Sequence, residues 1–260
     1  MRDLVSLLLG APVPKTETTD LSRYFNGYRG AFVLHDVAGN LTIRCNPAQC
    51  AKQVFPCSTF KIPNSLIFLE KEILRDQNQR EKWDGTKWPV DEWNRDQTLK
   101  SAYADSCVWF YKRLAAKVSP EVTRRYIQAL RYGNEKVPAD FSDGLPHYWL
   151  DGPLLISPDE QIAFLTRLQR GDVPFSPRTQ RIVRQIMVQQ KTGGTVLRGK
   201  TGTDGNWNTG ITTLGWYVGY LEKKNKPYIF AANIVGGKNP SGRKAREIVL
   251  RILKDQRLLS

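Results

Sequence analysis

Ser58 and Lys61 stand three positions apart at the start of an apolar helical run that continues to Glu70. Residues at positions i and i+3 are neighbours on a helix surface, so the hydroxyl and the amine would lie within mutual reach. The start of a helix favours negative charge, and Pro63 suits a first turn because the N–H it lacks has no helical partner there. The spacing is typical of an activated nucleophile. A helix-capping serine followed by a solvent-exposed lysine would show the same sequence pattern.

Lys200-Thr201-Gly202, about 140 residues further along, is the second short pattern with chemical potential. On a strand it offers a positive charge, a hydroxyl and an unobstructed backbone, which together can hold a carboxylate. Taken alone, it could equally be the turn-rich edge of a sheet. Ser-x-x-Lys followed by Lys-Thr-Gly is, however, the signature of serine β-lactamases and penicillin-binding proteins.

Five motifs in family order resemble the class D, or oxacillinase-type, serine β-lactamases. They are residues 56–65, Ser106-Cys107-Val108, Tyr132-Gly133-Asn134, Trp149-Leu150-Asp151-Gly152 and Lys200-Thr201-Gly202. The resemblance runs from about Gly30 to the C-terminal helix. It implies a hydrolase of β-lactam antibiotics. A structural interpretation suits the Tyr132 motif, as mainly a turn that shapes the cleft.

The resemblance implies that Lys61 is N-carboxylated and acts as general base, so carbon dioxide or bicarbonate is required and no other cofactor is expected. A lysine with its ordinary pKa of about 10.4 is protonated at neutral pH and cannot serve as a base. Burial among apolar side chains lowers that pKa. The candidate walls around Lys61 are Phe60, Val108, Trp149 and Leu150. The indole N–H of Trp149 is the expected donor to the carbamate.

The other motif residues take their roles from the same resemblance. Ser58 is the implied nucleophile, and its backbone N–H, with that of Thr203, is the expected oxyanion hole. Ser106 is expected to pass a proton to the lactam nitrogen. The expected substrate-binding residues are Val108, Lys200, Thr201, Gly202 and Arg243. Arg246 lies one helical spacing from Arg243 and stays open as the alternative ligand of the substrate carboxylate.

Two other functions share the same motifs. A penicillin-binding transpeptidase would use the serine, the lysine and Lys-Thr-Gly on peptidoglycan stem peptides. A β-lactam sensor domain would be acylated at the serine and barely turn over. Sustained turnover would separate the hydrolase from a sensor, which takes up one equivalent. The range of accepted β-lactams does not follow from the sequence.

The pattern of apolar residues predicts an α/β (α+β) fold of the β-lactamase/transpeptidase type. A hairpin is expected at 31–36 and 41–44, with strands at 195–200, 214–221 and 228–234 and a closing helix at 241–253. Residues 59–187 are mainly helical in pattern. We therefore predict one domain, 1–260, with an antiparallel sheet built from both termini and flanking helices. Its sheet lobe spans about 1–57 and 190–260, the inserted helical lobe about 58–189, and the cleft lies between them.

The net charge of +14 permits binding to anionic partners, but the basic residues are spread out and no nucleic-acid-binding signature is present. No run approaches the roughly 18 apolar residues of a membrane span. Residues 1–9 are too short for a good signal peptide, and are expected to be an N-terminal helix or the start of a mature or trimmed chain. A periplasmic or secreted location is implied only by the resemblance, and the oligomeric state is left open.

The four cysteines and two histidines lack the paired spacing of a metal site, so no metal is expected. Cys45 and Cys50 could close a short disulfide loop in an oxidising compartment, or remain free, because sequence does not supply the geometry. Cys57 and Cys107 adjoin motif serines. They are expected to be small packing residues and not nucleophiles.

Overall fold

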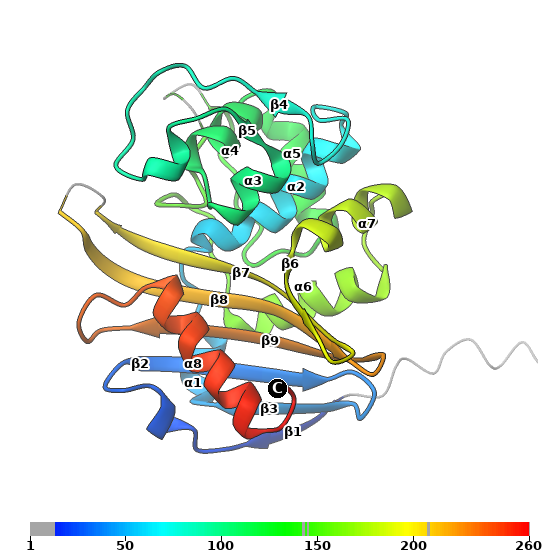
Figure 1. Cartoon of the computed structure of the whole chain (residues 1–260), viewed down its shortest axis with the longest axis vertical. Coiled ribbons are helices and arrows are strands. Elements are labelled where there is room, and N and C mark those ends of the chain that lie inside the picture. The colour runs from blue at the N-terminus through cyan, green and yellow to red at the C-terminus, as the bar shows by residue number, and fades with distance from the viewer. Residues whose placement is uncertain (1–13, 142–143, 145, 207–208, 260) are drawn as a thin grey trace, which may run out of the picture.

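The structure is a computed structural model, and it describes residues 14–141, 144, 146–206 and 209–259. The expectations for residues 1–9 therefore lie outside the described ranges. Helices and strands are segregated: helices gather at one end of a long twisted sheet, and single helices cover its faces (Figure 1).

The sheet has seven strands in the order β1-β3-β2-β9-β8-β7-β6. Their bounds are β1 Lys15–Thr18, β2 Arg29–Asp36, β3 Leu41–Cys45, β6 Val188–Thr192, β7 Thr195–Asn206, β8 Ile211–Lys223 and β9 Lys226–Val235. The first and last parts of the chain thus build one sheet, as predicted. All neighbouring pairs are antiparallel except the edge pair β1–β3, which is parallel.

The helices are α1 Pro47–Ala51, α2 Lys61–Glu70, α3 Leu99–Ala104, α4 Val108–Ala115, α5 Pro120–Ala129, α6 Pro158–Arg170, α7 Pro177–Ile186 and α8 Gly242–Asp255. A small second sheet pairs β4 Arg80–Glu81 with β5 Gln97–Thr98. Short 3-10 turns occupy Ser22–Tyr24, Cys57–Phe60 and Asp91–Trp93.

Two hydrophobic clusters lie on opposite faces of the main sheet. Because side chains alternate along a strand, Ala31 and Val33 of β2 belong to one cluster, and Phe32 and Leu34 belong to the other. The first cluster joins the sheet to α6 and to the helices of the upper lobe. The second lies beneath α8, which crosses the front of the sheet in Figure 1.

The range 58–189 contains more than the helices at the end of the sheet. Within it, α6 lies against β2 and β9. A capping box at Ser157 and Glu160 begins α6, since the Ser157 hydroxyl accepts from the Glu160 N–H and the Glu160 carboxylate accepts in return. One helix of the predicted helical lobe thus supports the sheet.

Candidate active site

Ser58 and Lys61 meet at the junction between a 3-10 turn and α2. The turn Cys57–Phe60 runs directly into the helix, whose first residue is Lys61. The Lys61 amine lies 2.9 Å from the Ser58 hydroxyl oxygen. Lys61 is fully buried, and Ser58 keeps 8% of its surface exposed. The predicted serine–lysine pair is therefore formed, and of the two only the serine keeps an exposed fraction.

The Lys61 amine has a strongly altered acidity. Burial lowers its pKa from 10.5 to about 7, because the charged form loses its hydration. Of the proposed walls, Phe60 and Trp149 are buried and their rings stack with centroids 5.6 Å apart. Val108 and Leu150 pack at the border of the same hydrophobic cluster. A large share of the amine is consequently neutral near pH 7.

Tyr111 and Ser65 also surround Lys61, and the motifs did not reveal them. The Lys61 amine lies 5.0 Å from the centre of the Tyr111 ring. The Ser65 hydroxyl donates to the Lys61 carbonyl oxygen at 2.6 Å and lies 2.9 Å from the Tyr111 hydroxyl. Helical spacing gives a partial signal, since Ser65 follows Lys61 by four positions. Contact with Tyr111 on α4 could not be found from spacing.

Ser106 and Lys200 form the second polar pair of the site. The Lys200 amine donates to the Ser106 hydroxyl at 3.0 Å and to the Thr201 carbonyl oxygen at 3.0 Å. Ser106 has a φ of +57°, a left-handed conformation that turns the chain between α3 and α4. Residues separated by more than ninety positions are thereby brought together.

The Lys200 amine loses its proton more readily than an ordinary lysine, whereas the motif alone suggested a fixed positive charge. Burial, together with the neighbouring Lys61 charge, lowers its pKa well below the ordinary lysine value. Its amine lies 5.6 Å from the centre of the Tyr103 ring, and the Tyr103 hydroxyl donates to the Gly199 carbonyl at 3.3 Å. Tyr103 is a second residue that the motifs did not reveal. A nearby anion would favour the charged form of Lys200.

The outer edge of β7 faces the Cys57–Phe60 turn. In the described ranges, β6 pairs with β7 only as far as Arg198, and beyond that point β7 packs against Cys57–Phe60. A side chain at Gly202 would come within 3.3 Å of the Cys57 Cβ and of the Pro56 carbonyl oxygen. The glycine thus lets Lys-Thr-Gly pass close to Ser58, which explains its place in the motif.

Thr203 and the start of α8 are joined across β7. The Thr203 hydroxyl accepts from the Gly242 N–H at 3.0 Å. A side chain at Gly242 would come within 2.6 Å of the Gly202 carbonyl oxygen and 2.8 Å of the Thr201 Cβ. The N-terminus of α8 is therefore fixed beside the Lys-Thr-Gly strand, which brings the following Arg243 near the site.

Arg243 and Arg246 have different surroundings. The Arg243 side chain is 85% exposed and lies 3.7 Å from the Glu247 carboxylate. Arg246 donates to the Gln189 side-chain oxygen at 3.1 Å. Arg243 thus pairs with a carboxylate on its own helix, whereas Arg246 has a neutral partner on β6.

Trp149 lies in a loop that is hydrogen-bonded to the Cys57–Phe60 turn. Its carbonyl oxygen accepts from the Cys57 N–H at 3.0 Å. The Asn134 side chain fixes the same loop, since it accepts from the Leu155 N–H at 3.1 Å and donates to the Pro153 carbonyl at 2.8 Å. The Tyr132-Gly133-Asn134 motif thus supports the loop that carries Trp149.

All four cysteines are free and buried. The Cys50 thiol donates to the Cys45 carbonyl oxygen at 3.2 Å, so the Cys45–Cys50 disulfide is not formed in the structure. No group of three metal-ligating side chains is present in the described part of the chain. No helix within the described ranges has both the length and the apolar character needed to cross a bilayer.

Known proteins with similar sequences indicate the family of this chain. Residues 30–254 match the penicillin-binding protein transpeptidase domain. Over 91% of its length the chain is 36% identical to the probable β-lactamase YbxI of Bacillus subtilis, of which it covers 84%. It is also 36% identical to β-lactamase OXA-20 of Pseudomonas aeruginosa, with 89% of this chain and 85% of that protein covered.

Two solved structures illustrate the structural similarity. A class D β-lactamase from Bacillus subtilis superposes with a TM-score of 0.84 at 36% identity, covering 93% of this chain and 97% of that one. The C-terminal domain of the Bacillus licheniformis BlaR penicillin receptor superposes with a TM-score of 0.87 at 33% identity, covering 96% and 100%. The fold is therefore shared by hydrolases and by a receptor domain.

Proposed function

The chain belongs to the class D β-lactamase family, and on that premise we propose that it hydrolyses the lactam amide of penicillin-type antibiotics through an acyl-enzyme on Ser58. The observation that carries the proposal is the 2.9 Å contact between the Ser58 hydroxyl and the buried Lys61 amine. A serine hydroxyl needs an adjacent base to become a nucleophile. A lysine whose pKa is lowered to about 7 is available for that chemistry at neutral pH.

The proposed base is the N-carboxylated form of Lys61. The neutral amine adds to carbon dioxide, forms a C–N bond and releases one proton, which leaves an anionic carbamate. The low pKa of Lys61 supports this step, because only the unprotonated amine reacts. Trp149, which lies in the adjoining loop, would donate its indole N–H to the carbamate. Carbon dioxide is the only small molecule that the proposal adds.

In acylation, the Ser58 oxygen bonds to the lactam carbonyl carbon while its proton passes to the carbamate on Lys61. The ring C–N bond then breaks, and the nitrogen takes a proton from Ser106. Lys200 supports this role because its amine lies 3.0 Å from the Ser106 hydroxyl and can replace the proton. The anionic carbamate on Lys61 favours the protonated form of Lys200, which keeps a proton available for that donation.

Before deacylation, the carbamic acid on Lys61 gives up the proton that it took from Ser58, and Lys200 is reprotonated, both by exchange with solvent. The carbamate on Lys61 then removes a proton from water, and the resulting hydroxide attacks the ester carbonyl. The Ser58 oxygen leaves and regains its proton. The backbone N–H groups of Ser58 and Thr203 are the proposed oxyanion hole, where fixed donors stabilise the negative charge that develops on the carbonyl oxygen. The close passage of β7 past the Cys57–Phe60 turn supports this pairing.

The substrate carboxylate would bind at the Lys-Thr-Gly strand. Lys200 and Thr201 offer an amine and a hydroxyl there, and Gly202 lets the strand pack closely against the Cys57 turn. The exposed Arg243 is the proposed partner at the end of α8. Val108, half-buried beside Ser106, would contact the apolar part of the ligand.

A sensor role is the second candidate, because the BlaR receptor domain matches over 96% of this chain. Reaction with a chromogenic β-lactam distinguishes the two functions. We expect turnover to continue over many equivalents and to be lost in Ser58→Ala. Release of a single equivalent of product, followed by a persistent acyl-enzyme in the mass spectrum, would favour the sensor. Sustained cleavage of stem peptides instead of β-lactams would favour a transpeptidase.

A further inference from the structure

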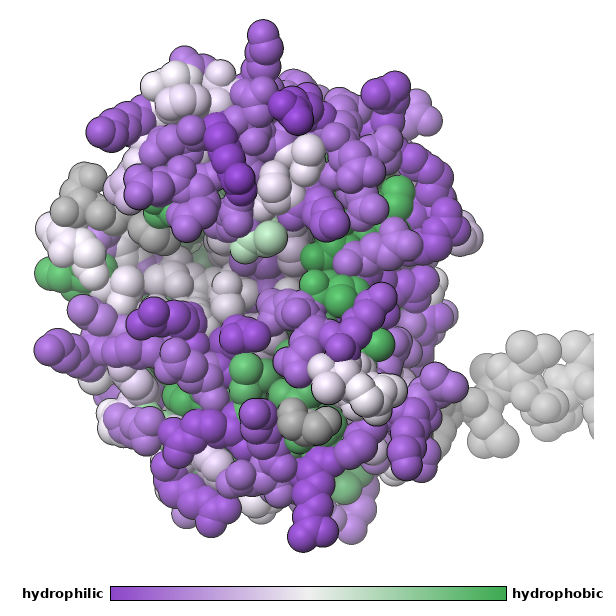
Figure 2. Space-filling view, viewed as in Figure 1, coloured by the Kyte–Doolittle hydropathy of each residue, from purple (hydrophilic) through white to green (hydrophobic). Residues whose placement is uncertain are grey.

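The segment from β8 to the end of α8 carries a large part of the chain's positive charge. Residues 222–257 hold ten Lys and Arg against three Asp and Glu, which accounts for half of the net charge of +14. The inner side of α8, formed by residues such as Ile248, Val249 and Ile252, is buried on the sheet. The charged side chains of α8 are therefore confined to its outer side, where hydrophilic residues dominate the molecular face (Figure 2).

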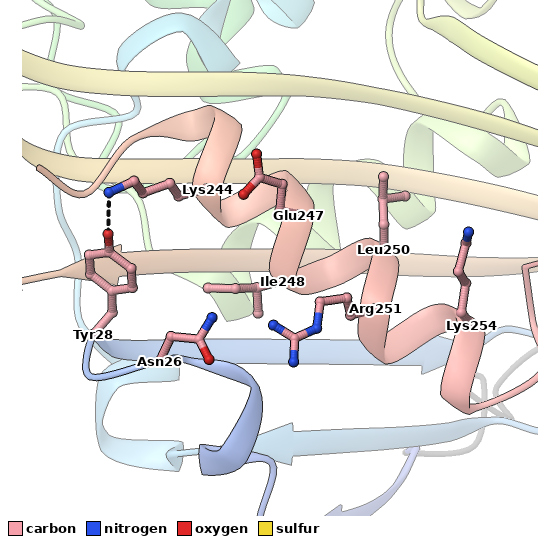
Figure 3. A pocket seen from close by; sticks show the side chains of 8 residues that line it. All are labelled: Asn26, Tyr28, Lys244, Glu247, Ile248, Leu250, Arg251 and Lys254. Carbon is pink, nitrogen blue, oxygen red and sulfur yellow. Dashed lines mark hydrogen bonds between the residues drawn. The ribbon is translucent and has the colours of Figure 1, made fainter.

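A groove of about 600 Å³ runs between α8 and the Asn26–Tyr28 loop. Lys244, Ile248 and Arg251 point from α8 toward this loop (Figure 3). Glu247 also lines the groove, but its carboxylate points away from the loop. Lys244 and Arg251 are seven residues apart, which corresponds to about 10 Å along a helix. The groove thus has an apolar floor at Ile248 between two cationic ends.

The two cationic ends are held in place by neutral groups. The Lys244 amine donates to the Tyr28 hydroxyl and to the Lys238 carbonyl oxygen, at 2.5 Å and 2.8 Å. The Arg251 guanidinium lies 5.9 Å from the centre of the Tyr24 ring. Among the described residues, neither Lys244 nor Arg251 forms an ion pair with a carboxylate, whereas Arg243 on the same helix pairs with Glu247. Their charges remain available to an external anion.

We propose that this basic face, formed by Arg23, Lys238, Lys244, Arg251, Lys254 and Arg257, binds the surface of an anionic lipid membrane. Its cations are spread over an exposed face. This distribution matches an extended anionic surface better than it matches a single small anion. The groove would receive one lipid headgroup, with its phosphate near Lys244 or Arg251 and its glycerol portion on Ile248. The association is peripheral and electrostatic, because the apolar side of α8 is already covered by the sheet.

The basic face is separated from the active site along α8. The N-terminus of α8 adjoins the Lys-Thr-Gly strand through the Gly242–Thr203 hydrogen bond, but the groove lies farther along the helix. Membrane binding would therefore leave Ser58 and Lys61 untouched. Binding and β-lactam hydrolysis should be separable by mutation.

The test is sedimentation of the whole chain with vesicles of phosphatidylglycerol and phosphatidylcholine in equal parts, compared with vesicles of phosphatidylcholine alone. We expect binding only to the mixed vesicles, and release as added sodium chloride screens the charges. Each cation near an anionic bilayer strengthens binding roughly fivefold. The double variant Lys244→Gln/Arg251→Gln should therefore bind roughly 25-fold more weakly.

The matched control is Arg125→Gln/Arg181→Gln, which removes the same charge from the exposed surface of α5 and α7. It should keep most of the vesicle binding, and both double variants should retain β-lactam hydrolysis. Equal loss in the two variants would overturn the proposal in favour of diffuse net charge, as would no binding to mixed vesicles. Stronger release by inorganic phosphate than by chloride at equal ionic strength, or preferential binding to double-stranded DNA, would also overturn it.

Discussion

Lys61 has an energetically costly environment. Its pKa falls from 10.5 to about 7 because the amine is buried, and each pKa unit corresponds to about 1.4 kcal/mol. Keeping this lysine therefore lowers the free energy of unfolding by roughly 4 kcal/mol near neutral pH. Such a cost is expected where a residue serves chemistry and not folding.

Replacement of Lys61 by Met should consequently stabilise the protein while abolishing turnover. In buffer free of carbon dioxide, we expect the free energy of unfolding to rise by roughly 2–4 kcal/mol. Because the folded-state pKa of this cation is lowered, the gain should be complete below about pH 7 and shrink as pH rises toward 10.5. Urea unfolding at several pH values measures it. A Lys61→Met variant less stable than the parent at pH 6 would contradict the burial argument.

The pH dependence of hydrolysis follows from the same group. Only the neutral amine of Lys61 can be carboxylated, and its pKa is about 7. At a fixed concentration of dissolved carbon dioxide, activity should fall at least tenfold for each pH unit below that value, because the neutral fraction falls tenfold and carbamate formation releases a further proton. Steady-state rates under a constant carbon dioxide atmosphere provide the measurement. A profile that stays flat from pH 7 to pH 5 would exclude Lys61 as the titrating base.

Arg243 and Arg246 can be separated by parallel substitutions. Arg243→Ala should raise KM roughly tenfold, because a charge-assisted contact with the substrate carboxylate is lost. Arg246→Ala should change KM by no more than about twofold, since Arg246 is held by a neutral hydrogen bond to Gln189. Initial rates across a range of substrate concentrations give the KM of each variant. The opposite order of effects would assign the carboxylate to Arg246.

At the scale of elements, α2 and α4 are joined behind the site by the Ser65–Tyr111 contact. Tyr111→Phe keeps the ring beside Lys61 and removes only the hydroxyl. We expect a loss of about 1 kcal/mol in stability and a higher bicarbonate concentration for half-maximal activity, because the Lys61 backbone is less firmly held. Bicarbonate titration of hydrolysis reports the second effect. A variant that loses stability with an unchanged bicarbonate requirement would give Tyr111 a purely structural role.

Several elements followed from the sequence, and others could not. The hairpin of β2 and β3 and the strands β7, β8 and β9 were predicted because apolar residues and turn residues mark them clearly. The edge strand β1 was not, since all four residues of Lys15–Thr18 are exposed and show no apolar alternation. From the sequence we assigned α6 to the helical lobe, because the apolar face of a helix does not show which surface the helix packs against.

The site residues were predictable to different degrees for a related reason. Ser58 and Lys61 lie on one helical turn, so their spacing alone indicates a contact. Lys200 and Ser106 required family motifs, because no local rule joins such distant positions. Tyr103 stayed hidden, since its approach to Lys200 depends on how α3 packs against β7.

At the scale of the whole molecule, the site forms where three distant segments converge. The Cys57–Phe60 turn, the Ser106 corner and β7 come from the start, middle and end of the chain. The hydrophobic cluster behind Lys61 connects the sheet with the helical lobe, so the site depends on the packing of both. The basic face around α8 lies over the other cluster, on the opposite face of the sheet.

Turnover of a chromogenic β-lactam before and after removal of carbon dioxide tests the carbamate mechanism most directly. The predicted result is sustained hydrolysis that falls on depletion, recovers on addition of bicarbonate, and is absent at every bicarbonate concentration in Lys61→Ala. The recovery should carry a labelled carbamate signal when carbon-13 bicarbonate is supplied. Full activity in buffer free of carbon dioxide, or turnover that survives in Lys61→Ala, would contradict the proposed role of Lys61.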